Sequence, residues 1–137
     1  MEINPFPAIF KMVTSVKDGF TFECEGDTIT FRLFGDNSCC EEITRGYYPA
    51  KSNSNTNDSK ITSWKQVTKQ DLPDEIQNLP DLCDDDNGDK FCELVAIELD
   101  FIDKKEHLVM ANKHNGYYCH DVTIESRLKG LIFQTCI

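Results

Sequence analysis

Two pairs of tyrosines are the residues of this chain best suited to binding. Each pair follows a glycine, in the segments Arg45-Gly46-Tyr47-Tyr48 and Asn115-Gly116-Tyr117-Tyr118. A tyrosine ring offers a large apolar face and a polar tip, a combination that is common in binding surfaces. Tyrosine also has a high β-propensity, so the simpler interpretation is that these rings fill strand positions. If the two segments are neighbours in space, their rings could line one groove, and we expect a binding site there.

A second candidate is the carboxylate run Asp84, Asp85 and Asp86, which Asp89 follows closely. The whole chain has 24 acidic against 14 basic residues and a formal net charge of −10. This balance repels nucleic acid, whose binding needs lysines and arginines, so we expect no direct nucleic-acid partner. An acidic surface suits a partner with a basic groove, in which the aspartates would mimic phosphates. The simpler alternative is that the charge only keeps the protein soluble.

Metal binding is not favoured by the spacing of the possible ligands. Aligning Gly88 with the sixth position of a calcium-binding EF-hand loop places Cys83 at the first position and Leu94 at the twelfth, and both are wrong. A zinc site usually takes its ligands as closely spaced pairs, and the chain has no Cys-x-x-Cys. The adjacent Cys39 and Cys40 would point to opposite faces of a strand. We therefore predict no metal and no cofactor.

Catalysis is also not favoured. Cys119 beside His120, or Cys40 with a distant histidine, could form a thiolate–imidazole pair. Neighbours on a strand face away from each other, however, so Cys119 and His120 are not natural partners. The chain contains no nucleophile elbow, phosphate loop or dinucleotide fingerprint. We predict no catalytic residues, and a metal- or thiol-dependent enzyme is the least favoured alternative.

The cysteines and the beginning of the chain bear on location. Seven cysteines form an odd and irregularly spaced set. Residues 1–10 lack a basic region followed by a long apolar run, and no segment approaches the roughly 20 apolar residues of a membrane helix. We therefore expect reduced thiols in a cytoplasmic protein with no membrane partner.

Antiparallel strands must position these residues. Apolar and polar residues alternate in Met12–Val16, Phe20–Cys24 and Ile29–Leu33, and turn residues separate the three segments at Lys17-Asp18-Gly19 and Glu25-Gly26-Asp27. This pattern is typical of a three-stranded meander. We predict a further strand near residues 40–44.

The remaining chain predicts a polar insertion followed by more strands. Residues 50–60 are almost entirely polar, and the apolar spacing of residues 64–82 fits one or two short helices. Alternation resumes at residues 95–101, 108–110, 118–124 and 131–135, which predicts a second meander. The fold class is therefore mainly β or α+β, with residues 1–137 as one domain and residues 50–91 as a polar, partly helical insertion.

The segments Asp36-Asn37-Ser38-Cys39-Cys40-Glu41 and His114-Asn115-Gly116-Tyr117-Tyr118 carry a resemblance. They are similar to the Asp-Cys-Cys-Glu and Ser-Asn-Gly-Tyr-Tyr motifs of a family of small phage and bacterial proteins catalogued as a domain of unknown function. The resemblance covers about residues 12–125. It implies a phage or mobile-element context, in which small acidic proteins often occlude a host defence protein or sequester a nucleotide signal.

These observations predict a non-enzymatic binding protein of viral or mobile-element origin. It would inhibit a host protein that has a basic surface, acting in the host cytoplasm through its acidic and tyrosine-bearing surface. The alternative is a binder of a small ligand or nucleotide signal. In that alternative the tyrosine rings would stack on the base, and the phosphate would be met by Arg45, Lys113, His114 or Arg127.

Overall fold

The computed structural model describes residues 5–35, 42–49, 60–79, 92–113 and 119–137. This part of the chain is mainly β, as the sequence predicts. Its nine strands form one open antiparallel sheet in the order β4-β7-β6-β5-β1-β2-β3-β8-β9. The strands are β1 (Ala8–Val16), β2 (Gly19–Cys24), β3 (Asp27–Leu33), β4 (Glu42–Tyr48), β5 (Lys60–Val67), β6 (Cys92–Phe101), β7 (Lys105–Lys113), β8 (Asp121–Ser126) and β9 (Gly130–Cys136).

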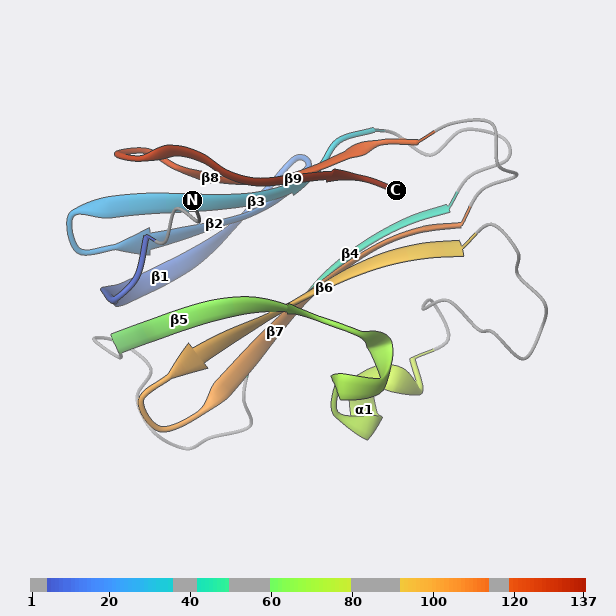
Figure 1. Cartoon of the computed structure of the whole chain (residues 1–137), viewed down its shortest axis with the longest axis horizontal. Helices are drawn as coiled ribbons and strands as arrows, with labels where there is room; N and C mark the ends of the chain where they lie inside the picture. Colours follow the sequence, from blue (N-terminus) through green and yellow to red (C-terminus); the bar gives the residue numbers. More distant parts are fainter. Residues whose placement is uncertain (1–4, 36–41, 50–59, 80–91, 114–118) are drawn as a thin grey trace.

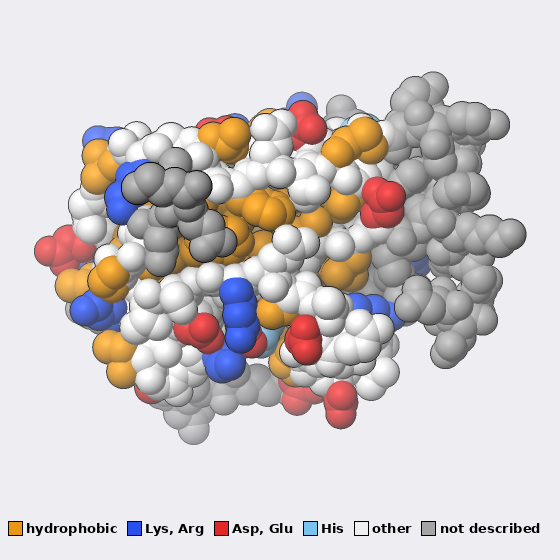
Figure 2. Space-filling view, in the orientation of Figure 1, with side chains coloured by type: hydrophobic (Ala, Val, Ile, Leu, Met, Phe, Trp, Pro, Cys, Tyr) orange, Lys and Arg blue, Asp and Glu red, His pale blue; other side chains and the backbone are white. Residues whose placement is uncertain are grey.

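The sheet folds over into two layers at its weakest junction. Strands β1 and β5 pair only through Ala8 with Ile61 and Ile9 with Lys60. On one side of this junction, β5, β6, β7 and β4 form the lower layer of Figure 1, and on the other side β1, β2, β3, β8 and β9 form the upper layer. Figure 2 shows hydrophobic side chains gathered along the line where the two layers face each other.

The first meander is confirmed. Strands β1, β2 and β3 pair in succession, with Val16 opposite Gly19 and Cys24 opposite Asp27. Two-residue turns therefore join the strands, as the turn residues predicted. Gly26 has a φ of +86°, a value that residues with a side chain rarely adopt, which explains a glycine in the second turn.

The last four strands are divided between the layers. Strands β6 and β7 form a hairpin in the lower layer, whereas β8 and β9 form a hairpin in the upper layer, where β8 pairs with β3. Strand β7 pairs instead with β4. The chain thus crosses between layers after β7, which local alternation of residues does not reveal.

The helical expectation for residues 64–67 was wrong. Trp64 lies in β5, an inner strand between β6 and β1, and its ring packs against Phe133 of β9 at 5.8 Å between centroids. A register shift between Ile61 and Ser63 disturbs the alternation that marks a strand. Among the described residues, helix is confined to a 3-10 turn, η1 (Lys69–Asp71), and the single turn α1 (Asp74–Gln77). Part of the expected 50–91 insertion is therefore integral to the sheet, and β4 extends beyond the expected 40–44 to Tyr48.

The main core lies between the two layers. Its most buried large side chains are Phe22, Ile29, Leu33, Ile61, Leu99, Leu108 and Ile124. A second, smaller cluster lies on the outer face of the lower layer, where Leu72 and Ile76 cover Ala96 and Val109. Strands β6 and β7 are therefore buried on both faces.

The expectation of reduced thiols differs from the structure at two positions. Cys119 and Cys136 form a disulfide, with Cα atoms 5.7 Å apart and a sequence separation of 17. The β8–β9 pairing, which sets Asp121 opposite Cys136, brings these residues together. Cys24 has a free thiol whose pKa is raised to about 11, first by burial and then by the negative charge of Asp27. Cys39, Cys40 and Cys83 lie outside the described residues.

The position of the core predicts that alanine substitutions at two leucines differ strongly in their effect on the free energy of unfolding. Leu99 is fully buried between the layers, whereas Leu128 is 67% exposed. We expect Leu99→Ala to lower the free energy of unfolding by about 2–5 kcal/mol, because it leaves a cavity. The matched Leu128→Ala should change it by less than about 0.5 kcal/mol. Urea denaturation monitored by tryptophan fluorescence measures both, and equal effects would contradict the described core.

Candidate binding pocket

The adjacent tyrosines of β4 serve opposite faces of the lower layer. Tyr47 packs into the main core, and Tyr48 packs with the outer cluster beneath α1. This follows from the period of two in a strand. The two rings therefore do not line one groove together, and each has its own surroundings.

Tyr47 belongs to the interior of the protein. Its ring lies edge-on to Phe22 of the upper layer, with centroids 5.3 Å apart. Its hydroxyl donates a 2.5 Å hydrogen bond to Oε1 of Glu106, a side chain that is almost fully buried. The pKa of Tyr47 is raised, first by burial and then by the hydrogen bond to Glu106 and its charge. Tyr47 thus acts as a donor to a buried carboxylate.

Glu106 has a second partner in the interior. The Lys104 ammonium lies 3.5 Å from Oε2 of Glu106, and both side chains are at most 4% exposed. The same ammonium lies 4.8 Å from the centre of the Phe101 ring. A buried carboxylate needs such compensation, because removing it from water is costly.

Arg45 also faces the interior of the sandwich. Its guanidinium donates hydrogen bonds to the carbonyl oxygen of Leu33 at 2.7 and 2.9 Å and to that of Gly35 at 2.6 Å. It lies 3.7 Å from a carboxylate oxygen of Asp18. Arg45 therefore ties β4 to the end of β3 across the two layers, and it is not beside Tyr48.

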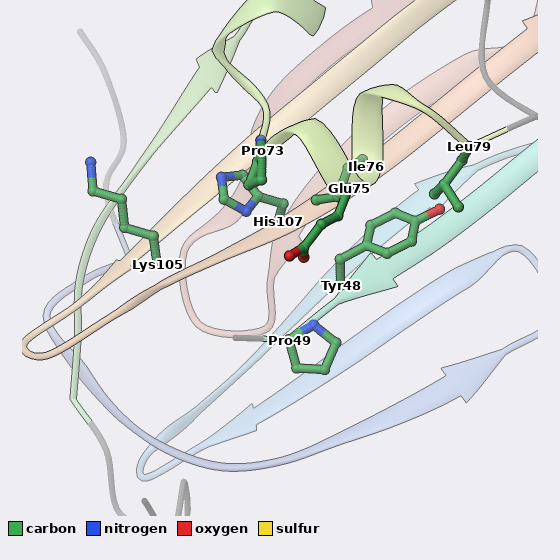
Figure 3. Close-up of a pocket in the computed structure, with 8 residues that line it drawn as sticks. All are labelled: Tyr48, Pro49, Pro73, Glu75, Ile76, Leu79, Lys105 and His107. Atoms are coloured by element: carbon green, nitrogen blue, oxygen red, sulfur yellow. The ribbon is translucent and has the colours of Figure 1, made fainter. Parts of the chain in front are cut away.

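Tyr48 lines a pocket of about 390 Å³ on the outer face of the lower layer. This volume lies within the range of small-molecule sites. Figure 3 shows the carboxylate of Glu75 between the Tyr48 ring and His107, with Lys105 at the far end. The lining residues are Tyr48, Pro49, Pro73, Glu75, Ile76, Leu79, Lys105 and His107.

Strand register places a polar row beneath this pocket. Tyr48 pairs with His107, His107 with Glu98, and Glu98 with Lys65, across four neighbouring strands. His107 Nε2 lies 3.4 Å from Oε1 of Glu98, and Lys65 Nζ lies 3.0 Å from Oε2. Lys105 Nζ is 3.6 Å from the same Oε2. These groups compensate the charge of Glu98, which is 6% exposed.

The pKa of Glu98 reflects two opposing influences. Burial raises it, but the hydrogen bonds from Lys65 and His107 and the positive charges of Lys105 and Lys65 together outweigh burial, so the net pKa is lowered. Glu98 therefore carries a negative charge on the outer face of the lower layer at neutral pH.

The sequence predicted only part of this pocket. Of the expected binding residues, the structure describes Arg45, Tyr47 and Tyr48, and only Tyr48 lines the pocket. The others lie outside the described residues: Asp84, Asp85, Asp86, Asn115, Tyr117 and Tyr118. Sequence reasoning missed Glu75, Lys105 and His107. The period of two could have separated Tyr47 from Tyr48, but nothing local links β4 to β7 or α1.

Neither a metal-binding cluster nor a membrane-spanning helix is found among the described residues. They contain no group of three or more His, Cys, Asp or Glu side chains that could hold a metal ion. Among the same residues, no helix has the length and apolar character needed to cross a membrane.

Comparison with known proteins gives no relative: no family model, no curated protein and no solved structure matches this chain.

The Tyr47 hydroxyl predicts a stability change that depends on Glu106. Tyr47→Phe should lower the free energy of unfolding by about 1–3 kcal/mol, because the buried carboxylate loses its O–H donor. In a Glu106→Gln background the same change should cost less, since the acceptor no longer carries a full charge. Urea denaturation of the four proteins measures this coupling. A loss that is the same in both backgrounds would show that the hydroxyl does not act through Glu106.

Glu98 predicts a loss of stability in acid. Its folded pKa lies below the ordinary value of 4.5, so its contribution is present above pH 4.5 and is lost as the pH falls through the folded value. Free energies of unfolding between pH 7 and pH 3 should fall less steeply in Glu98→Gln than in the wild type. Lys65→Gln should reduce this loss of stability in acid only in part, because the compensating charge of Lys105 remains. If the free energy of unfolding of Glu98→Gln fell with pH as steeply as that of the wild type, Glu98 would not be the source of the acid sensitivity.

Proposed function

We propose that this chain is a non-enzymatic binding protein of viral or mobile-element origin that inhibits a host protein bearing a basic surface. The observation that supports this proposal is the position of Tyr48. One of the predicted anchor residues lines a pocket beside the Glu75 carboxylate, in a chain of net charge −10. An aromatic anchor beside a carboxylate, on a protein of negative net charge, suits a basic partner, because opposite charges steer the encounter and the ring supplies buried area.

The proposed place of action is the host cytoplasm. A reducing cytosol would keep Cys119 and Cys136 as thiols. Cys136 is in β9 of the upper layer, whereas the pocket lies on the outer face of the lower layer. The proposed binding therefore does not require the disulfide.

A pull-down with matched charge reversals tests the proposal. Immobilised wild-type protein should capture a host partner at about 50 mM salt and release it at about 0.5 M, because exposed charges are then screened. Glu75→Lys should abolish capture. Glu125→Lys, an equal charge reversal at an exposed position of β8 in the upper layer, should leave it intact. Capture that is the same with all three proteins, or no capture from any plausible host, would contradict the proposal.

A second candidate function is the binding of a small nucleotide signal. The pocket volume supports it, together with the Tyr48 ring and the Lys105 ammonium, which could meet a base and a phosphate. A rise in melting temperature with one member of a nucleotide panel would support this candidate, since a ligand that binds only the folded state stabilises it. The two candidates differ in the charge that the pocket accepts.

A further inference from the structure

We infer that the pocket beside Tyr48 receives the cationic side chain of a partner, an arginine or a lysine. The inference rests on the proposed function, because it identifies the part of the basic partner that enters this pocket. Three properties of the described residues support it: the shape of the pocket, the position of the Glu75 carboxylate and the pairing of the neighbouring basic groups.

The apolar walls suit the stem of a long basic side chain. Pro49, Pro73, Ile76 and Leu79, together with the Tyr48 ring, are the apolar part of the lining of this pocket of about 390 Å³. Lysine and arginine bury their methylene stems against apolar surface while the charged head finds polar partners. The pocket thus combines apolar walls with one carboxylate, that of Glu75, and with Lys105 and His107.

The charged head of such a side chain would lie between Glu75 and Tyr48. The Glu75 carboxylate lies between the Tyr48 ring and His107 (Figure 3). A carboxylate forms strong charge-assisted hydrogen bonds with a guanidinium or an ammonium. The face of a tyrosine ring attracts the same cation through its quadrupole. Two groups that favour positive charge therefore line the same pocket.

The basic residues of the lining do not oppose this arrangement. Lys105 Nζ lies 3.6 Å from Glu98 Oε2 and 3.7 Å from Asp100 Oδ1, so its charge is compensated within the sheet. In Figure 3 its ammonium lies at the end of the pocket away from Tyr48 and Leu79. His107 faces Glu98 through Nε2.

The surrounding charges also favour a cation over an anion. Asp71 and Asp74 lie on the same η1–α1 segment as Glu75. Lys69 lies on this segment as well, but of these four charged groups only Glu75 lines the pocket, so an entering phosphate would meet its carboxylate. The lysines Lys65 and Lys105 already face Glu98 and Asp100. The same charges that would repel a phosphate attract a guanidinium.

Two capped peptides that differ only in charge provide the test. The probes are acetyl-Gly-Arg-Gly-amide and its neutral counterpart acetyl-Gly-citrulline-Gly-amide, each titrated against the wild-type protein. Methyl NMR signals of Ile76 and Leu79 report occupancy of the pocket. We expect saturable shifts with the arginine peptide and at least tenfold weaker binding of the citrulline peptide.

Variants of the protein test whether the arginine peptide binds the Glu75 carboxylate. Glu75→Gln keeps the shape of an exposed side chain and should weaken binding of the arginine peptide about tenfold. Glu125→Gln removes an equal charge from the upper layer and should leave binding unchanged. Adenosine monophosphate, added as an anionic probe with an aromatic base, should leave the Ile76 and Leu79 signals in place.

Three results would overturn the inference: equal binding of the two peptides, unchanged binding in Glu75→Gln, or saturable shifts with adenosine monophosphate in place of the arginine peptide. Failure of the inference can be separated from failure of the proposed function. If Glu75→Lys still abolishes capture of a salt-sensitive host protein while the arginine peptide does not bind, the proposed function holds and another part of the partner occupies the pocket.

Discussion

Strands β6 and β7 are buried on both faces, and much of the structure follows from this constraint. On the inner face Leu99 and Leu108 meet the upper layer, and on the outer face Ala96 and Val109 lie beneath Leu72 and Ile76. Any charged residue on these strands must then find compensation away from water. The inner Glu106 is met by Lys104 and Tyr47, and the outer Glu98 by Lys65, Lys105 and His107.

The two charged clusters differ in what they contribute. The inner cluster is sealed between the layers and joins neighbouring strands, so its effect is on stability. The charged cluster around Glu98 lies under a pocket that is open to solvent and bordered by a short helical segment, so under the proposed function its effect would extend to binding. Tyr47 and Tyr48 connect the two, because consecutive residues of β4 face the two sides of the same layer.

The sequence predicted the parts of this arrangement that depend on local pattern. Alternation and turn residues located the meander from β1 to β3 and the strand cores of β6, β8 and β9. Alternation of Val95 and Ile97 with Ala96 and Glu98 correctly separated two faces, but it suggested that one face is solvated. Ala96 is fully buried because α1 folds back over it, a contact that no local period encodes. The same holds for the pocket: the strand order places His107 beside Tyr48, and the packing of Leu72 and Ile76 on β6 and β7 brings Glu75 to them.

The alternation of β4 has a consequence for how this protein can vary. Ile43, Arg45 and Tyr47 contact the interior of the sandwich, whereas Tyr48 contributes to the surface that would meet a partner. Natural selection can therefore act on neighbouring codons in opposite ways: conservation for the inward residues, and diversification for the outward one as a partner changes. If the proposed function holds, a lineage in conflict with its target could alter recognition at Tyr48 by disturbing only the small cluster of Leu72, Ile76, Ala96 and Val109, and not the main core.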